Sequence, residues 1–214
     1  MGAFRLVTRG YRLWLAGIAG YLIGGVLSAD IAARLHARVK RDAVDLRTVG
    51  SGNPGGANAF ANLGKSWGAA VILGDIAKGA VGAHAGRLIA GDAGAYLAGT
   101  TVVLGHCFPA TAGFKGGKGV ATSGGTTLTC FPAYTAVDIA TVAAGFVASK
   151  HAGKTTAASS SLFIVAAMLW KARGWKNGWG PRPTLGLPLY AVATSAIIAY
   201  KFLSAPAHMG DRER

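Results

Sequence analysis

Charged residues are scarce in this sequence, and acidic ones are the scarcest. Only 14% of the 214 residues are charged, with eight Asp and Glu against 22 Lys and Arg. A soluble domain carries about a quarter charged residues, so this shortage argues against a soluble globular protein. The basic residues cluster in short loops between long apolar runs, a pattern typical of membrane proteins. Nucleic acid is not an expected partner, because proteins that bind it spread Lys and Arg along a polar face.

Cysteine is also rare, with only Cys107 and Cys130 in the chain. Neither belongs to a Cys-x-x-Cys pair or to a spaced cluster of Cys and His, so we expect no disulfide framework, no metal and no redox cofactor. We interpret both cysteines as small apolar side chains that fill space inside the fold.

Apolar runs of helical length are abundant. Seven of them lie at residues 11–33, 67–85, 88–104, 120–130, 132–149, 155–170 and 185–202. A helix that spans a bilayer needs about 20 apolar residues, and the run at 120–130 is too short unless its helix begins among the preceding glycines. We predict an all-α integral membrane protein of about seven transmembrane helices. It forms one polytopic domain over residues 1–214, with a basic leader at 1–12 and a polar tail at 203–214.

Glycine and lysine alternate within residues 105–122, between the third and fourth apolar runs. The candidates for phosphate binding there are Lys115, Gly116, Gly117, Lys118 and Gly119. Glycines leave backbone N–H groups uncovered, and the lysines add mobile positive charge, so together they favour an anion such as phosphate. The alternative is a glycine-rich surface loop without a ligand, because short glycine motifs often occur by chance.

A second glycine-rich stretch occupies residues 50–58. Four glycines and a proline fall within seven residues of it, which predicts that the stretch is not helical. Its hydroxyl, amide and backbone donors make it a second candidate anion site, with Ser51, Gly52, Asn53, Gly55 and Asn58 as the binding residues.

Some residues inside the apolar runs also carry information. Asp75 and Lys78 lie three residues apart on one helix face, where they can neutralise each other; charges inside a membrane span point to function, although a structural pair is nearly as good an explanation. His106 lies in the glycine- and lysine-rich stretch at 105–122, where it either transfers a proton or braces the loop by hydrogen bonds. Gly20 and Gly24 have the spacing that lets two membrane helices approach closely.

The order of the apolar runs predicts a topology. Both glycine loops lie between an odd-numbered run and the next even-numbered one, so they open on the same side of the membrane. That side has more Lys and Arg than the other, and positive loops face the cytoplasm. We therefore predict a multi-pass protein of the inner cell membrane, with its N-terminus outside and its C-terminus and motif loops in the cytoplasm.

The motifs resemble those of a known family. Ser-Gly-Asn-x-Gly-x-x-Asn at 51–58, Asp-x-x-Lys-Gly at 75–79, Gly-His-x-Phe-Pro at 105–109 and Phe-Lys-Gly-Gly-Lys-Gly-Val-Ala-Thr at 114–122 are similar to motifs of the bacterial acyl-phosphate:glycerol-3-phosphate acyltransferases. The resemblance covers about residues 20–160. It implies a seven-helix membrane enzyme of phospholipid synthesis that needs neither acyl-CoA nor a metal.

The resemblance also implies a reaction and its partners. A fatty acyl group would move from acyl phosphate to the 1-hydroxyl of sn-glycerol 3-phosphate, giving lysophosphatidate and phosphate. Lys118, Lys115 and the amides of 116–119 would hold the glycerol phosphate, and the 51–58 loop would hold the acyl phosphate. His106 and Lys118 would act in catalysis, supported by Asp75 and Lys78. Membrane lipid and the soluble enzyme that makes acyl phosphate are the further expected partners.

Several positions depart from the family pattern. Ala61 stands where the first motif usually has an arginine, and the serine-containing third motif, expected near 155–162, has an ambiguous register. The usual C-terminal His-x-x-Asn corresponds at best to His208 and Asp211. These changes leave open whether the chain is a fully active enzyme.

A membrane transporter or channel for a phosphorylated metabolite is the alternative function. It would also use basic loops and intramembrane acids such as Asp75, Asp92 and Asp138. Transporters often contain repeated halves, and neither glycine motif occurs twice in this sequence.

Overall fold

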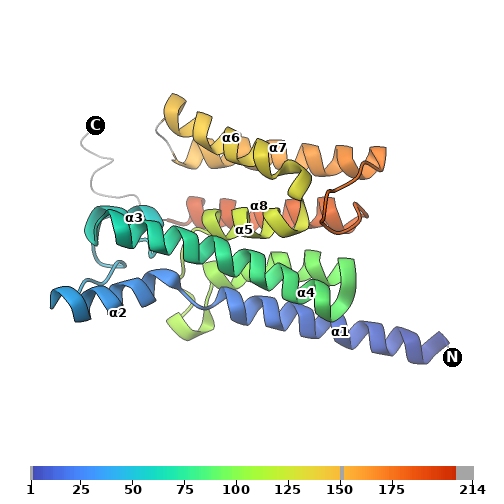
Figure 1. Ribbon diagram of the computed structural model, residues 1–214, viewed down its shortest axis with the longest axis horizontal. Helices are drawn as coiled ribbons and strands as arrows, with labels where there is room; N and C mark the ends of the chain where they lie inside the picture. Colours follow the sequence, from blue (N-terminus) through green and yellow to red (C-terminus); the bar gives the residue numbers. More distant parts are fainter. Residues whose placement is uncertain (1, 150–151, 206–214) are drawn as a thin grey trace.

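The computed structural model describes residues 2–149 and 152–205, so His208 and Asp211 lie outside the described part. Within it every regular element is a helix (Figure 1), which confirms the all-α prediction. The α-helices are α1 (Gly2–Gly24), α2 (Ser28–Lys40), α3 (Gly56–Asn62), α4 (Lys65–Cys107), α5 (Val120–Cys130), α6 (Pro132–Ser149), α7 (Ala152–Arg173) and α8 (Gly186–Leu203), and η1 (Ala110–Ala112) is a short 3-10 helix.

Helix α4 is a hairpin of two antiparallel limbs. Its backbone leaves helical geometry at Ala90 and at Gly91, where φ is 67°, a value that glycine adopts without a steric penalty. Gly86 and Gly94 then face each other so closely that a Cβ on either would strike the other's carbonyl oxygen. The two runs predicted at 67–85 and 88–104 thus correspond to the two limbs, but the chain reverses at 90–91 and not near 86.

Small residues bring α1 against the second limb of α4. A Cβ on Gly20 would lie 2.6 Å from the carbonyl oxygen of Ala98, and one on Gly24 would lie 2.9 Å from the Cα of Val102. Side chains this close are not tolerated, so both positions need glycine. The predicted close helix contact at Gly20 and Gly24 is confirmed.

The segment at 34–65, between the first two apolar runs, contains two helical pieces. Helix α2 continues to Lys40, and α3 begins at Gly56 and includes Asn58. The prediction that the whole glycine stretch is non-helical was therefore wrong for its last three residues. The turns that exclude a helix lie earlier, where Gly50 and Gly52 have positive φ and Gly55 is extended.

The C-terminal helices pack around an aromatic cluster. Phe131 stacks on Tyr134 with ring centroids 5.3 Å apart, and the ring of Phe163 lies 5.5 Å from Tyr134 and 5.7 Å from Tyr190. These side chains come from the α5–α6 junction, α7 and α8, and they are buried. The cluster holds these helices side by side and so fixes one wall of the site described below.

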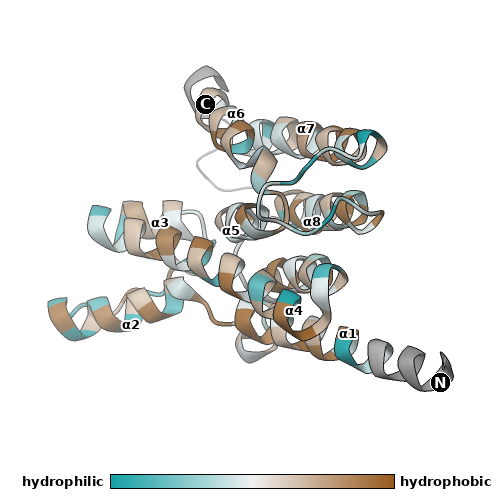
Figure 2. Ribbon diagram, turned by 45° about the vertical axis from the view of Figure 1, so that its right-hand side comes forward, coloured by the Kyte–Doolittle hydropathy of each residue, from teal (hydrophilic) through white to brown (hydrophobic). Residues whose placement is uncertain are grey.

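Many large apolar side chains are exposed on the outside of the bundle, and hydrophobic residues occupy much of the length of its helices (Figure 2). Four stretches of the described chain are long and apolar enough to cross a membrane, at 10–40, 65–112, 152–173 and 186–203, and the second contains both limbs of α4. Helix α5 has 11 residues, about 16 Å at 1.5 Å per residue, and is too short to cross alone because it begins only after the last loop glycine.

Candidate active site

Both glycine loops reach one cavity of about 560 Å³ that lies between α3, α4, α5, α6, α7 and α8. The first loop in chain order, at 50–58, contributes Asn53 and Gly55 to the cavity wall. The second loop, within 105–122, contributes Lys118 and Gly119. His106 and Asp75 also line it, whereas Ser51, Gly52, Asn58, Lys78, Lys115, Gly116 and Gly117 do not. Two loops about sixty residues apart in sequence therefore serve a common space.

Asn58 organises the first loop from inside. Its side chain is only 4% exposed. The amide nitrogen donates to the carbonyl oxygens of Leu46 and Val49 at 2.8 and 3.1 Å, and the amide oxygen accepts the N–H of Ser51 at 3.0 Å. Because these bonds use both ends of the amide, Asn58 shapes the loop that presents Asn53 to the cavity.

The middle glycines of the second loop are used for packing. Gly116 N–H donates to the carbonyl of Cys107 and Gly117 N–H to that of His106, both at 3.2 Å. A Cβ on Gly117 would strike the imidazole of His106. These N–H groups were predicted to be uncovered. Instead, their hydrogen bonds hold the loop against the end of α4, and only glycine allows the backbone to come so close.

Uncovered N–H groups lie at the next position along the chain, where α5 begins. The first hydrogen bond of this helix runs from Ser123 N to Gly119 O at 2.8 Å, so the N–H groups of Val120 and Ala121 have no partner within the helix. Gly119, Val120 and Ala121 all line the cavity. A helix N-terminus attracts anions through its dipole and free donors, so this part of the loop is the best suited to an anion.

Lys118 stands beside this helix start. Its side chain is half-buried, and its Nζ lies 4.5 Å from the ring centroid of Phe202 on α8. Burial lowers the pKa of Lys118, and the nearby positive charge of Lys201 lowers it further. Lys115, by contrast, is exposed. The two lysines of the motif thus lie in different environments, and Lys118 faces the cavity.

A buried trio of Asp75, Lys78 and His106 lies beneath the loops. Asp75 and His106 are each 3% exposed. The Nζ of Lys78 is 2.9 Å from Oδ1 of Asp75 and 2.8 Å from Nδ1 of His106, and it donates to the carbonyl of Val26 at 2.9 Å. The predicted Asp75–Lys78 pair exists, and it also contacts the predicted catalytic histidine.

The contact with Lys78 determines what His106 can offer to a ligand. An ammonium group only donates hydrogen bonds, so Nδ1 of His106 must accept, and the ring proton of the neutral tautomer is then on Nε2. His106 lines the cavity, and its Nε2 edge packs on Gly117. In this tautomer Nε2 of the imidazole is a hydrogen-bond donor and not a base.

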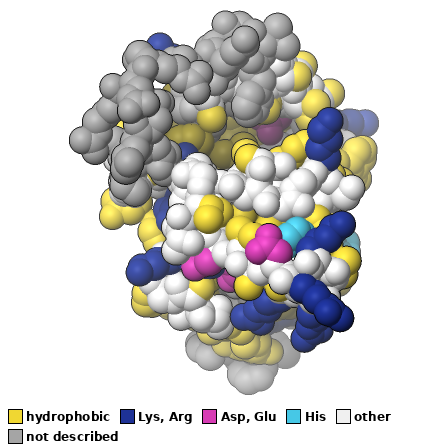
Figure 3. All heavy atoms as spheres, turned by 90° about the vertical axis from the view of Figure 1, so that its left-hand side faces the viewer, with side chains coloured by type: hydrophobic (Ala, Val, Ile, Leu, Met, Phe, Trp, Pro, Cys, Tyr) yellow, Lys and Arg dark blue, Asp and Glu magenta, His cyan; other side chains and the backbone are white. Residues whose placement is uncertain are grey.

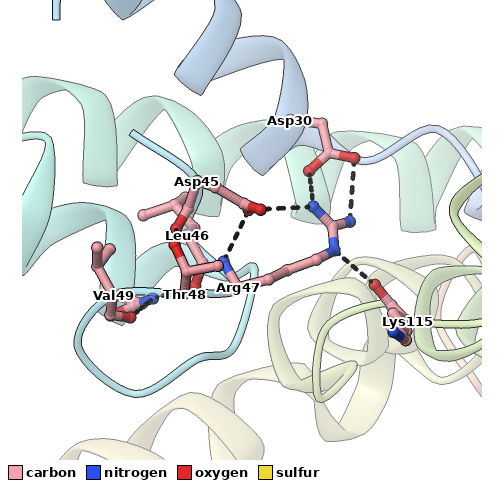
Figure 4. Close-up of polar contacts among 8 residues, drawn as sticks. Asp30, Asp45, Leu46, Arg47, Thr48, Val49 and Lys115 are labelled. Atoms are coloured by element: carbon pink, nitrogen blue, oxygen red, sulfur yellow. Dashed lines mark hydrogen bonds and ion pairs between the residues drawn. The ribbon is translucent and has the colours of Figure 1, made fainter. Parts of the chain in front are cut away.

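Arg47 ties the two glycine loops together (Figure 4). Its guanidinium binds the carboxylate of Asp30 on α2 at 2.7 and 3.1 Å, and its Nε donates to the carbonyl of Lys115 at 3.1 Å. The backbone N–H of Arg47 donates to Asp45 at 2.9 Å. The hydrogen bond with Asp30 raises the pKa of Arg47. Arg47 was not among the predicted site residues. The sequence indicated its role only through its position in the polar stretch Asp45-Leu46-Arg47.

Helix α7 adds hydroxyl groups to the far wall. Thr155, Thr156, Ser159 and Ser160 line the cavity, while Ser161 donates to the carbonyl of Ala157 on its own helix. This is the region in which a serine-containing third motif was expected. Ala61 lies on an exposed part of α3 and does not line the cavity. In the described part of the chain, no three His, Cys, Asp or Glu residues lie together as a metal site would require.

Comparison with known families then decides the relationship. Residues 14–209 match the family model described as glycerol-3-phosphate acyltransferase. The chain belongs to the glycerol-3-phosphate acyltransferase family. This match confirms the resemblance drawn from the motifs, and it favours an enzyme over a transporter.

Individual relatives agree with the family match. A glycerol-3-phosphate acyltransferase of Bacillus subtilis (strain 168) is 47% identical over 52% of this chain, and one of Thermoanaerobacter pseudethanolicus (strain ATCC 33223 / 39E) is 33% identical over 74%. The aligned parts span 55% and 78% of those two proteins. This chain therefore matches little more than half the length of the Bacillus relative.

A solved structure extends the likeness to the whole fold. The glycerol 3-phosphate form of PlsY, an integral membrane glycerol 3-phosphate acyltransferase, has a TM-score of 0.72 and 27% identity, covering 94% of this chain and 97% of that one. Together with the apolar helices, this likeness identifies the chain as an integral membrane protein.

We predict that Arg47 and Asp30 stabilise the site as a coupled pair. Arg47→Gln and Asp30→Asn should each lower the midpoint of thermal unfolding in detergent. The double variant should lose less free energy of unfolding than the two single variants together, with a coupling free energy of about 0.5–3 kcal/mol. Arg38→Gln, on an exposed position of α2, is the control and should change little. Strictly additive losses would show that the pair does not act as a unit.

Proposed function

We propose that this protein transfers a fatty acyl group from acyl phosphate to the 1-hydroxyl of sn-glycerol 3-phosphate, producing lysophosphatidate and phosphate. The observation that carries the proposal is the single cavity that residues of both glycine loops line. Acyl transfer to glycerol 3-phosphate needs two phosphorylated substrates in contact, and a shared cavity supplies the required proximity. The solved relative named above is described in its glycerol 3-phosphate form, which supports the choice of acceptor.

One phosphate binds at the start of α5. The free N–H groups at Val120 and Ala121 and the ammonium of Lys118 converge there, and each favours a phosphate oxygen. Asn53 and Gly55 face the same cavity from the first loop, and they hold the second phosphate. The departing phosphate is stabilised by these same donors, which remain in place as negative charge develops on it.

The acyl chain lies along the apolar part of the cavity. Ile139 and Val142 of α6, Phe163 of α7 and Ile198 of α8 line that part, and an apolar chain is stabilised by leaving water for such a surface. The polar loops at one end and the apolar wall beyond them match an amphiphilic product such as lysophosphatidate.

His106 donates a hydrogen bond from Nε2 to a substrate oxygen, because Lys78 occupies its Nδ1. The acceptor hydroxyl then loses its proton to another group, and a substrate phosphate oxygen is the nearest chemical candidate. An acyl phosphate is already activated, so the reaction does not depend on a nucleophilic serine. Asp75 and Lys78 support His106 without touching the reacting atoms.

The protein crosses the inner cell membrane seven times, with the N-terminus outside and the motif loops and C-terminus in the cytoplasm. The two α4 limbs and helices α1, α5, α6, α7 and α8 make the seven crossings, α5 with help from the loop before it. Lys and Arg side chains gather on the end that carries both loops (Figure 3), which supports a cytoplasmic position for that end. The soluble enzyme that makes acyl phosphate would deliver it there.

Purified protein in detergent micelles should form lysophosphatidate from acyl phosphate and glycerol 3-phosphate, a result that no transporter would give. Lys118→Met should lower kcat/KM about 10²-fold, the typical loss when one preorganised donor is removed. Lys115→Met, an exposed position outside the cavity, is the matched control and should stay within a few-fold of wild type. If neither the wild type nor Lys115→Met forms lysophosphatidate, the proposed activity is refuted.

His106→Gln should keep turnover within about tenfold of wild type and leave the pH–rate profile between pH 6 and 8 unchanged, because the glutamine amide can still donate. Loss of a general base costs typically 10²–10⁴-fold. His106→Leu, which cannot donate, is the contrasting variant. A loss of 10²-fold or more in His106→Gln, with the pH dependence removed, would show that the imidazole transfers a proton.

Labelling of single cysteines should place the two ends of the bundle on opposite sides of the membrane. Cys107 and Cys130 are buried and should react little. In right-side-out vesicles, an impermeant thiol reagent should modify Trp179→Cys, exposed in the α7–α8 connection, and should reach Lys115→Cys only after permeabilisation. The opposite pattern would invert the topology, and equal labelling of both without permeabilisation would rule out the seven-crossing arrangement.

A further inference from the structure

An acidic side chain lies in the part of the cavity where the acyl chain belongs. Asp138 of α6 and Ser159 of α7 both line the cavity, and the Ser159 hydroxyl donates to Oδ1 of Asp138 at 2.7 Å. Ile139, Val142 and Phe163 line the wall beside them, together with the hydroxyl-bearing Thr155, Thr156 and Ser160 of α7. This pair takes no part in the phosphate chemistry described above.

The pair is well removed from the motif end of the bundle. Asp138 is 11 residues before the end of α6 at Ser149, about 16 Å along the helix at 1.5 Å per residue. Ser159 is seven residues after the start of α7, or about 10 Å. Helices α6 and α7 meet at the end of the bundle where the glycine loops lie (Figure 1). A substrate held at the loops would therefore pass the pair with the middle of its chain.

Among the residues that the structure describes, no cation neutralises Asp138. None of the ion pairs found in the described part of the chain includes it, and its hydrogen bond to Ser159 uses only Oδ1. An unsubstituted alkyl chain would press against this carboxyl group and remove it from water without giving it a hydrogen bond, which is unfavourable. A chain with a hydroxyl group at that depth would supply the missing donor, and the site would then reject the chain that lacks it.

We propose that Asp138 and Ser159 form a specificity site for an acyl group with a hydroxyl substituent near the middle of its chain. The substituent donates to the free carboxyl oxygen of Asp138, and the Ser159 hydroxyl holds that carboxyl group in place. This inference rests on the proposed acyltransferase function, since it concerns the donor of the same reaction. No bond is made or broken at the pair, which acts only on the choice of donor.

The test compares hydroxylated and unsubstituted donors. The ratio of kcat/KM for 10-hydroxystearoyl phosphate to that for stearoyl phosphate is measured in wild type, Asp138→Leu, Asp138→Asn and Ser159→Ala. We expect the ratio to fall about tenfold in Asp138→Leu, less in Asp138→Asn, which keeps an acceptor, and partly in Ser159→Ala. Ser161→Ala is the matched control, because Ser161 lies on the same helix but does not line the cavity, and its ratio should equal that of wild type.

A second series moves the hydroxyl group along the chain. With 3-hydroxystearoyl phosphate the ratio should be the same in wild type and Asp138→Leu, because that hydroxyl lies near the glycine loops. An unchanged ratio for the 10-hydroxy donor in both Asp138→Leu and Ser159→Ala, with the variants folded and active on stearoyl phosphate, overturns the inference. An equal change for both hydroxyl positions also overturns it.

A binding measurement separates this inference from the proposed reaction. In lipid nanodiscs, 10-hydroxystearic acid should raise the thermal midpoint of wild type more than stearic acid does, and Asp138→Leu should remove the difference. If wild type forms no lysophosphatidate, the proposed function is refuted. The binding difference between the two acids then tests the specificity site independently. Equal midpoints for both acids in wild type would refute it.

Discussion

The buried ammonium of Lys78 is the interaction on which the site depends. A charge inside the bundle is strongly unfavourable unless opposite charge and hydrogen-bond acceptors surround it. Asp75, His106 and the carbonyl of Val26 provide them, at 2.8 to 2.9 Å from Nζ. These partners belong to both limbs of α4 and to the junction of α1 and α2. Neutralising one lysine thus fixes the relative position of three segments directly below the glycine loops.

The loops follow from that arrangement. With its Nδ1 bound to Lys78, His106 turns its other edge toward Gly117, and only a residue without a side chain can pack there. The second loop folds over the histidine, and its next residues begin α5 at the cavity. Arg47 then joins the first loop to the second through the Lys115 carbonyl. The proposed phosphate site and the apolar cavity come together because these contacts bring distant parts of the chain to one place.

Much of the fold could be predicted from local patterns. Apolar runs gave α5 and α6 with the bounds observed, at Val120–Cys130 and Pro132–Ser149, because Gly119 and the Phe131-Pro132 pair interrupt the helices there. The spacing of Gly20 and Gly24 predicted a close helix contact, because close packing of membrane helices needs small residues, and the structure shows that the partner is α4. Topology predicted only that both loops open on the same side of the membrane, because both fall between an odd-numbered run and the next even-numbered one; the shared cavity is a finding of the structure.

The misses concern bonds between residues far apart in the sequence. No local pattern indicates that the N–H groups of Gly116 and Gly117 donate to the carbonyls of Cys107 and His106. The free N–H groups at Val120 and Ala121 were therefore not predicted as the donors for an anion. Arg47 could not be assigned because its partners lie 17 and 68 residues away.

The most direct test of the account is an experimental structure with glycerol 3-phosphate bound. It should show the phosphate against the N–H groups of Val120 and Ala121 and the ammonium of Lys118, facing Asn53. A phosphate held instead by Gly116 and Gly117, or outside the shared cavity, would contradict it.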